Sequence, residues 1–290
     1  MFGWWVQRRR RRLLAEPFPE EWRQAIEREV SLWHAVPAPA RGKLEDDLRC
    51  FVAERSWEPC GGLELTAPRR AIIAAQACIL TLGRTVDAFD HVRSIVVYPH
   101  AFWAPDVWED EAGVVTEELT ESEGEAWQWG TVVLSWQEVL RDSRSPNGRN
   151  LVLHELAHQL DLLDVLEQAY PGGGDEQDLH RRWIETFLAA FDDFTERVDS
   201  GRRVKAIDAY GAEDEAEFFA VATESFFERG AYLKSHHPGL YEVLAAYYAQ
   251  DPASWTWPRS RAPVAGETGR ERRRRRRAEE RRRRKGKPPA

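Results

Sequence analysis

The stretch LVLHELAHQLDLLD, residues 151–164, decides the fold and indicates the chemistry. It contains the pattern H-E-x-x-H, in which His154 and His158 stand four residues apart. Residues at this spacing share one face of a helix, about one turn apart, so both imidazoles can reach a single zinc ion. Glu155 lies about 100° further around the helix, where it can point at a zinc-bound water rather than at the metal. The stretch therefore predicts a zinc-binding helix.

The alternative is a buried helix whose histidines merely satisfy polar groups of the core. The stretch is apolar almost all round, and His154, His158 and Asp161 form its polar stripe. Because unpaired buried polar groups cost several kcal/mol, such a stripe needs partners, and a metal ion supplies them. Zinc lowers the pKa of a bound water to about 7, and Glu155 can accept its proton as the water attacks a carbonyl. The pattern favours a catalytic zinc site.

A third protein ligand is required, and the sequence offers three acidic candidates. Asp164 stands at the spacing of the metzincin pattern, but position 161 lacks the glycine that this pattern needs for its turn. Residues 213–229 predict a second buried helix, on which Glu217, Glu224 and Glu228 share one face, with Glu217 and Glu224 as the ligand candidates. Spacing alone does not choose between these two glutamates, and a solvated acidic face is the remaining alternative.

The segments around the zinc helix predict an α+β fold. Apolar residues recur at helical intervals between residues 19 and 82. A small sheet is expected from three β-branched runs, at 94–98, 113–120 and 131–136, with 121–130 as the loop of a hairpin. Asn150 is expected to cap the zinc helix, which we place from Leu151 to about Glu167. Later helices are expected at 178–198, at 213–229 and in a final segment that ends near Trp257.

Composition excludes fibrous, membrane-spanning and disulfide-rich classes of protein. The chain has 290 residues, 42% of them hydrophobic, with 19 Gly and 16 Pro. Its longest apolar run, residues 71–82, is far shorter than the ~20 residues that a spanning helix needs. The N-terminus has the wrong order of charges for a secretory signal. The cysteines Cys50, Cys60 and Cys78 lack paired spacing, which fits a reducing compartment, so we expect a cytoplasmic protein with no membrane partner.

Charge is strongly partitioned along the chain. Residues 266–290 hold 13 basic and 4 acidic residues, and Arg8 to Arg12 form a second basic run. The segment between them, 13–265, carries 23 basic against 45 acidic residues. The C-terminal tail has no periodic apolar face, so we expect it to be disordered. Because it also lacks interleaved aromatic residues, nucleic acid is expected to bind weakly at most, through this tail.

Several motifs together resemble the Mlc titration factor A family of zinc-dependent peptidases. The resemblance covers roughly residues 18–257 and rests on HELAHQLD (154–161), YGAEDEAEFFAVATESFFE (210–228), FPEEW (18–22), VVYPHAFWAPDVWEDEAGVV (96–115), GTVVLSWQEV (130–139) and YYAQDP (247–252). The chain departs from the family pattern at Asp164-Val165, which follows the zinc helix, and in its Arg-rich ends. The resemblance implies a zincin-like catalytic domain at 86–257 and a helical part at 18–85, flanked by a basic extension at 1–17 and the tail at 258–290.

The resemblance also implies residue roles and a function. In the family, the third ligand of the single zinc ion is the glutamate that corresponds to Glu217. A further similarity, to lethal-factor-type catalytic domains, implies that Tyr210 stabilises the oxyanion. Family members are cytoplasmic, have aminopeptidase-like activity on peptide substrates and bind a glucose-responsive repressor protein. The alternative function is therefore a non-catalytic protein that sequesters a transcriptional repressor.

Overall fold

The computed structural model describes residues 2–84, 86–100, 102–109, 115–122, 124–125, 130–160 and 175–258. The first part is helical, as the apolar periodicity predicts. Its helices are α1 (Phe2–Ala15), α2 (Glu20–Glu29), α3 (Ser31–Ala35), α4 (Ala38–Glu54) and α5 (Ala67–Leu80). Helix α1 lies against α4, where Arg10 forms ion pairs with Glu54 and Asp87 at 2.6 and 2.5 Å. The basic extension is thus helical and docked over residues 2–15.

Helix α5 forms the centre of this helical part. Its residues from Ala71 to Leu80 are all buried, because the run is apolar on every side. The helix packs against α2 and α4 on the N-terminal side and against the zinc-helix candidate α7 (Leu151–Leu160) on the other. Gln76 is the single polar side chain within the buried run. A helix buried all round in this way joins two halves of one core.

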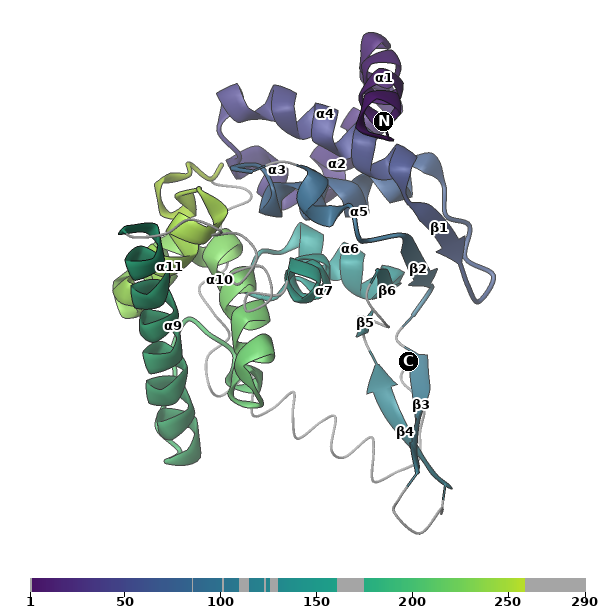
Figure 1. The fold of residues 1–290 in the computed structure, drawn as a ribbon. Helices are drawn as coiled ribbons and strands as arrows, with labels where there is room; N and C mark the ends of the chain where they lie inside the picture. The colour runs from purple at the N-terminus through teal and green to yellow at the C-terminus, as the bar shows by residue number, and fades with distance from the viewer. Residues whose placement is uncertain are drawn as a thin grey trace.

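The principal sheet has four short strands in the order β1-β2-β6-β5. They are β1 (Ser56–Pro59), β2 (Ser94–Tyr98), β5 (Gly124–Glu125) and β6 (Thr131–Ser135). Strands β1, β2 and β6 are parallel, with Trp57 opposite Ile95 and Val96 opposite Val133, whereas β5 runs antiparallel to β6. A separate antiparallel pair, β3 (Phe102–Glu109) and β4 (Val115–Ser122), extends away from this sheet (Figure 1).

The C-terminal half is again helical. It comprises α6 (Trp136–Arg144), α7, α9 (Asp175–Asp199), α10 (Glu215–His236) and α11 (Pro238–Tyr248), with 3-10 turns η1 (Val86–Phe89), η2 (Ala209–Ala212) and η3 (Pro252–Ser254). Helix α7 lies between the N-terminal helices and the group formed by α9, α10 and α11 (Figure 1). Among its neighbours are α10, α5 and β6, so α7 contacts all three regions of the fold.

Aromatic side chains hold α10 in place. Phe218, Phe219, Phe226 and Phe227 are each at most 2% exposed. The ring of Phe226 packs against Phe227, Tyr241 and Tyr248, with centroids 5.0, 5.1 and 5.6 Å away. Such clusters contribute through buried area and through ring geometry. The apolar face of α10 therefore fixes the position of this helix, and its acidic face is directed toward α7.

The observed fold confirms the α+β class and corrects two expectations. The runs at 94–98 and 131–135 are strands, but they pair in parallel with each other. The run at 113–120, seen as β4, pairs with β3 rather than across a 121–130 loop with the run at 131–136. The predicted hairpin pairing was wrong because β-branched composition marks a strand without choosing its partner. Trp136 starts a helix instead of ending a strand, since the Ser135 hydroxyl accepts a hydrogen bond from Glu138 N.

Two expectations lie outside the described residues. The first is the continuation of the zinc helix to about residue 167, since the described part of α7 ends at Leu160. The second is the disordered tail, of which only Pro258 is described. Within the described ranges, no helix has both the length and the apolar character needed to cross a membrane.

Replacing Phe226 by Ala tests whether the aromatic cluster anchors α10. Phe226 is fully buried among three rings, so the substitution should lower the free energy of unfolding by about 3–5 kcal/mol. Urea denaturation followed by circular dichroism measures the change. Glu242→Ala, at an exposed position of α11, is the control and should change stability by less than about 0.5 kcal/mol. A loss below about 1 kcal/mol for Phe226→Ala would show that α10 is held by other contacts.

Candidate metal centre

Helix α7 carries the two motif histidines, and its first turn is fixed by a cap. Asn150 caps the helix as expected, because its Oδ1 accepts a hydrogen bond from Leu153 N at 3.1 Å. Eight of the ten residues of α7 are buried, which leaves His154 and His158 as its less buried positions, with side chains 15% and 18% exposed. The two rings lie one turn apart with centroids 4.8 Å from each other. Both imidazoles therefore face the same space.

Helix α10 brings Glu217 to that space in its first turn. Asp214 caps the helix, with Oδ1 accepting from Glu217 N at 2.8 Å. The preceding turn η2 lies tight against α10, because a Cβ atom on Gly211 would stand 2.4 Å from Cγ2 of Val221. Only glycine permits this approach. The local sequence thus fixes the start of α10, and with it the position of Glu217 in the first turn. It also fixes the position of Tyr210, one residue before Gly211.

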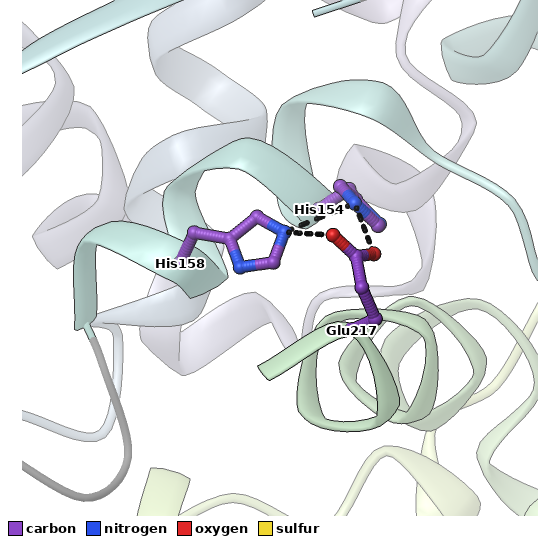
Figure 2. A group of neighbouring side chains, drawn as sticks. All are labelled: His154, His158 and Glu217. Atoms are coloured by element: carbon purple, nitrogen blue, oxygen red, sulfur yellow. Dashed lines mark hydrogen bonds and ion pairs between the residues drawn. The ribbon is translucent and has the colours of Figure 1, made fainter. Parts of the chain in front are cut away.

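His154, His158 and Glu217 form one cluster (Figure 2). Nε2 of His154 lies 3.1 Å from Nε2 of His158 and 3.2 Å from Oε2 of Glu217. Nε2 of His158 lies 3.3 Å from Oε1 of the same carboxylate. One ligand atom from each residue therefore falls within 4.8 Å of the others. His158 and Glu217 are about sixty residues apart in the sequence, and the packing of α7 on α10 brings them together.

The donor set fits a zinc ion. Two imidazole nitrogens and one carboxylate are ligands that zinc takes in catalytic sites, which leave a fourth position for water or substrate. Oε2 of Glu217 is buried and, although it faces His154, makes no hydrogen bond of normal geometry with the residues that the structure describes. A buried carboxylate oxygen without such a bond calls for a cation. These three residues are thus the group in the described part of the chain that suits a metal ion.

Glu155 lies deeper, beside the cluster. Glu155 is 3% exposed, and its Oε2 has no hydrogen-bond partner among the described residues. Burial raises the pKa of the Glu155 carboxyl to about 7, and the neighbouring positive charge of His154 and His158 opposes the shift. A carboxylate with this pKa can accept a proton near neutral pH and can also return it.

Glu217 and His154 are electrostatically linked in the chain without metal. Burial alone would raise the pKa of Glu217, but its contacts with His154 and His158 lower that pKa to about 2. Burial alone would lower the pKa of His154, but Glu217 and Glu224 raise it well above its usual value. The cluster therefore holds an ionised carboxylate, which is the protonation state required of a metal ligand.

Tyr210 lies at the open side of the cluster. It is 53% exposed, and its ring centroid is 6.3 Å from that of His154. Burial of the hydroxyl group and the nearby charge of Glu217 raise the pKa of Tyr210. The phenol is thus a hydrogen-bond donor at neutral pH.

The structure separates two of the three candidates for the third ligand. Glu217 faces Nε2 of both histidines, whereas Glu224 lies 2.9 Å from Nδ1 of His154, on the other edge of that ring. Asp164 lies outside the described residues. Sequence spacing did not choose between Glu217 and Glu224 as the third ligand. The packing of α10 on α7 distinguishes them, because it places the two carboxylates on different edges of the His154 ring.

The roles of Gln76 and Glu228 in the site were not predicted from the sequence. Gln76 Oε1 accepts a hydrogen bond from Asn150 Nδ2 at 2.9 Å, and Glu228 Oε1 accepts from the same nitrogen at 3.1 Å. Both residues are buried and support the first turn of α7 from two sides. The available signal was a glutamine inside the apolar run of α5 and a glutamate among the phenylalanines of α10, because a buried polar side chain needs a partner.

Comparisons with known proteins give similarities over most of the chain. The family described as glucose-regulated metallo-peptidase M90 matches residues 4–249. A Synechocystis protein described as uncharacterized is 33% identical over 250 residues, covering 86% of this chain and 90% of its own. Proteins called Mlc titration factor A from Klebsiella pneumoniae and Escherichia fergusonii are 34% and 31% identical over 243 residues, covering 80% of this chain and 86% of theirs. The family match begins before Arg8, so it includes the N-terminal basic run that our sequence analysis set apart from the family pattern.

Proposed function

The chain belongs to the family of glucose-regulated metallo-peptidases M90, and we propose that it is a zinc-dependent, aminopeptidase-like enzyme with a zincin-like catalytic domain. The observation that carries the proposal is the convergence of His154, His158 and Glu217 beside the buried carboxylate of Glu155. Three candidate ligands and one unpaired base in one place match the needs of peptide hydrolysis at a metal.

In this proposal His154 and His158 bind one zinc ion through Nε2, and Glu217 binds it through its carboxylate. Zinc at this position would polarise a carbonyl and lower the pKa of a water molecule to about 7. The support is the donor chemistry of the three residues and the absence of a normal hydrogen bond on Oε2 of Glu217. The remaining steps depend on side chains of the chain itself.

Glu155 acts as general base in the proposed reaction. Its Oε2, which has no hydrogen bond, accepts the proton of the attacking water and then passes it to the nitrogen that leaves. In the chain without metal, burial raises the pKa of Glu155 to about 7, so this carboxyl group can both take up and release a proton near neutral pH. Burial, which causes the shift, is thus part of its function.

Tyr210 donates a hydrogen bond to the oxygen of the carbonyl under attack. Negative charge develops on that oxygen, and a donor placed beforehand stabilises it more than it stabilises the uncharged substrate. The exposed position of Tyr210 and its 6.3 Å ring separation from His154 support this role. The substrate is a peptide or an aminoacyl amide, as the family description of a metallo-peptidase suggests. We further propose a cytoplasmic location, which the absence of disulfides at Cys50, Cys60 and Cys78 supports.

Binding of a transcriptional repressor is the second candidate function. It is favoured by the relatives called Mlc titration factor A, whose name states that they titrate Mlc. The two functions are separable, because a binding surface does not require Glu155 as a base. Repressor binding that persists in Glu155→Gln while hydrolysis is lost would assign them to different features of the chain.

Alanine variants of the proposed ligands test the metal site. Purified wild type should contain one zinc per chain, and His154→Ala, His158→Ala or Glu217→Ala should contain well below one, because a two-ligand site binds far more weakly. Elemental analysis with protein quantification measures the ratio. Glu213→Ala, at an exposed position near the start of α10, is the control and should keep full occupancy. Full zinc occupancy in Glu217→Ala would transfer the ligand role to another acid.

Glu155→Gln tests the general base. The amide has the same shape but cannot take up a proton, so turnover should fall by about 10²–10⁴-fold while the zinc content stays at one per chain. Hydrolysis of a panel of chromogenic aminoacyl and blocked peptide substrates measures turnover. Undiminished hydrolysis would reject the role of Glu155. Loss of zinc together with activity would show that this residue supports the metal instead.

Tyr210→Phe tests the oxyanion contact. Removal of the hydroxyl should lower kcat by about 10–10³-fold and leave KM within about threefold, because the hydrogen bond strengthens only as charge develops. Steady-state kinetics on the best substrate of the panel separates the two parameters. An effect confined to KM would assign Tyr210 to substrate binding.

A further inference from the structure

We propose that Glu224 is a positioning residue that fixes the tautomer and orientation of His154 and ties this ring to the start of helix α7. The inference rests on the proposed function in one respect, which is that His154 binds the metal through Nε2. Glu224 itself faces away from the other two ligands. Its effect on the metal is therefore exerted through the imidazole.

The two oxygens of Glu224 have different partners on α7. Oε1 lies 2.9 Å from Nδ1 of His154, and Oε2 accepts a hydrogen bond from the backbone N of Asn150. Glu224 is 3% exposed, so water does not compete for either oxygen. A carboxylate in this place accepts on both sides, and when Nε2 of His154 binds the metal, as proposed, Nδ1 carries the hydrogen that Oε1 of Glu224 accepts. The lone pair of the neutral ring is left on Nε2, the atom that faces His158 and Glu217.

Asn150 makes this contact more than a single hydrogen bond. The same residue caps α7 through Oδ1 and gives its backbone N–H to Glu224. One carboxylate thus binds the first turn of the helix and the histidine that projects from it. Rotation of the ring about its side-chain bonds would break the bond to Oε1, and a shift of the helix start would break the bond to Oε2. Second partners of this kind orient metal-ligating histidines and raise their basicity.

Glu228 secures the loop before α7 in a parallel way. Its Oε2 accepts from the backbone N atoms of Asn147 and Gly148 at 2.9 and 2.8 Å, and its Oε1 accepts from Asn150 Nδ2. Gly148 has a φ of +87°, which permits the turn that presents these donors. Glu228 is 1% exposed and lies one helical turn after Glu224. Its hydrogen bonds within the described residues go to this loop and to Asn150, and none goes to a histidine.

The two glutamates therefore form a matched pair for experiment. Both are buried carboxylates on α10 that accept hydrogen bonds from the segment 147–150, but Glu224 alone of the two touches a proposed ligand. Glutamine at either position keeps the size and replaces one accepting oxygen by a donating NH₂ group. At 224 that group must face either the Asn150 N–H or the His154 Nδ1–H, and each is itself a donor. A merely structural role predicts equal consequences at the two positions.

Zinc affinity of the full chain distinguishes the roles. Wild type, Glu224→Gln and Glu228→Gln are titrated with zinc in competition with a chromogenic chelator, and thermal midpoints of the metal-free proteins report the cost to folding. We expect about 10–100-fold weaker zinc binding in Glu224→Gln and less than about threefold in Glu228→Gln. Unchanged affinity in Glu224→Gln, or an equal loss in both variants, would overturn the proposal.

The tautomer of His154 gives a second readout that does not require any variant to fold. Long-range ¹H–¹⁵N correlation spectra of zinc-loaded wild type identify which nitrogen of His154 carries the hydrogen and give the chemical shift of that hydrogen. We expect an Nδ1–H whose proton is shifted downfield by its bond to the Glu224 carboxylate, and an Nε2–H, or an Nδ1–H without this shift, would overturn the inference. Failure of wild type to bind zinc would instead remove the proposed function, whereas a loss of affinity confined to Glu224→Gln concerns the positioning role.

Discussion

The packing of α7 on α10 is the contact on which the rest of the structure depends. Helix α7 is buried on nearly all sides, yet it carries two histidines and a glutamate. A buried helix can hold such groups only if its neighbour supplies partners for them. Helix α10 does so with two acids seven residues apart, Glu217 on one edge of His154 and Glu224 on the other. The aromatic face of α10 sets its position, and its acidic face completes the site.

The same burial controls the electrostatics. Desolvation acts on every carboxyl group near the cluster and, unopposed, raises its pKa. At Glu217 two histidines reverse the effect, and the group stays ionised. At Glu155 the histidines oppose the effect without reversing it, and the pKa stands at about 7. Two glutamates of one cluster thereby have widely different pKa values in the chain without metal.

The local features of this site could be predicted from sequence, whereas its tertiary features could not. The H-E-x-x-H spacing and the Asn150 cap depend on neighbours along one helix, and both are found as expected. Glu217 was assigned by family resemblance, because the periodicity of α10 places Glu224 on the same face and only the crossing of two helices separates them. The partner of β4 was misassigned, and the strand β1, which ends at Pro59, was not recognised because four residues carry too little pattern. Gln76 and Glu228 were visible as polar residues in apolar runs, but their shared partner Asn150 is distant from both in sequence.

Anomalous diffraction at the zinc absorption edge tests the central claim most directly, because it locates the metal without any substitution. Crystals of the purified protein, grown without added metal, would be measured just above and just below the edge. We expect a single strong anomalous peak per chain, about 2.0–2.2 Å from Nε2 of His154, Nε2 of His158 and a carboxylate oxygen of Glu217. A peak coordinated by Glu224, or clear density for the three side chains with no anomalous signal even after zinc is added, would contradict the assignment.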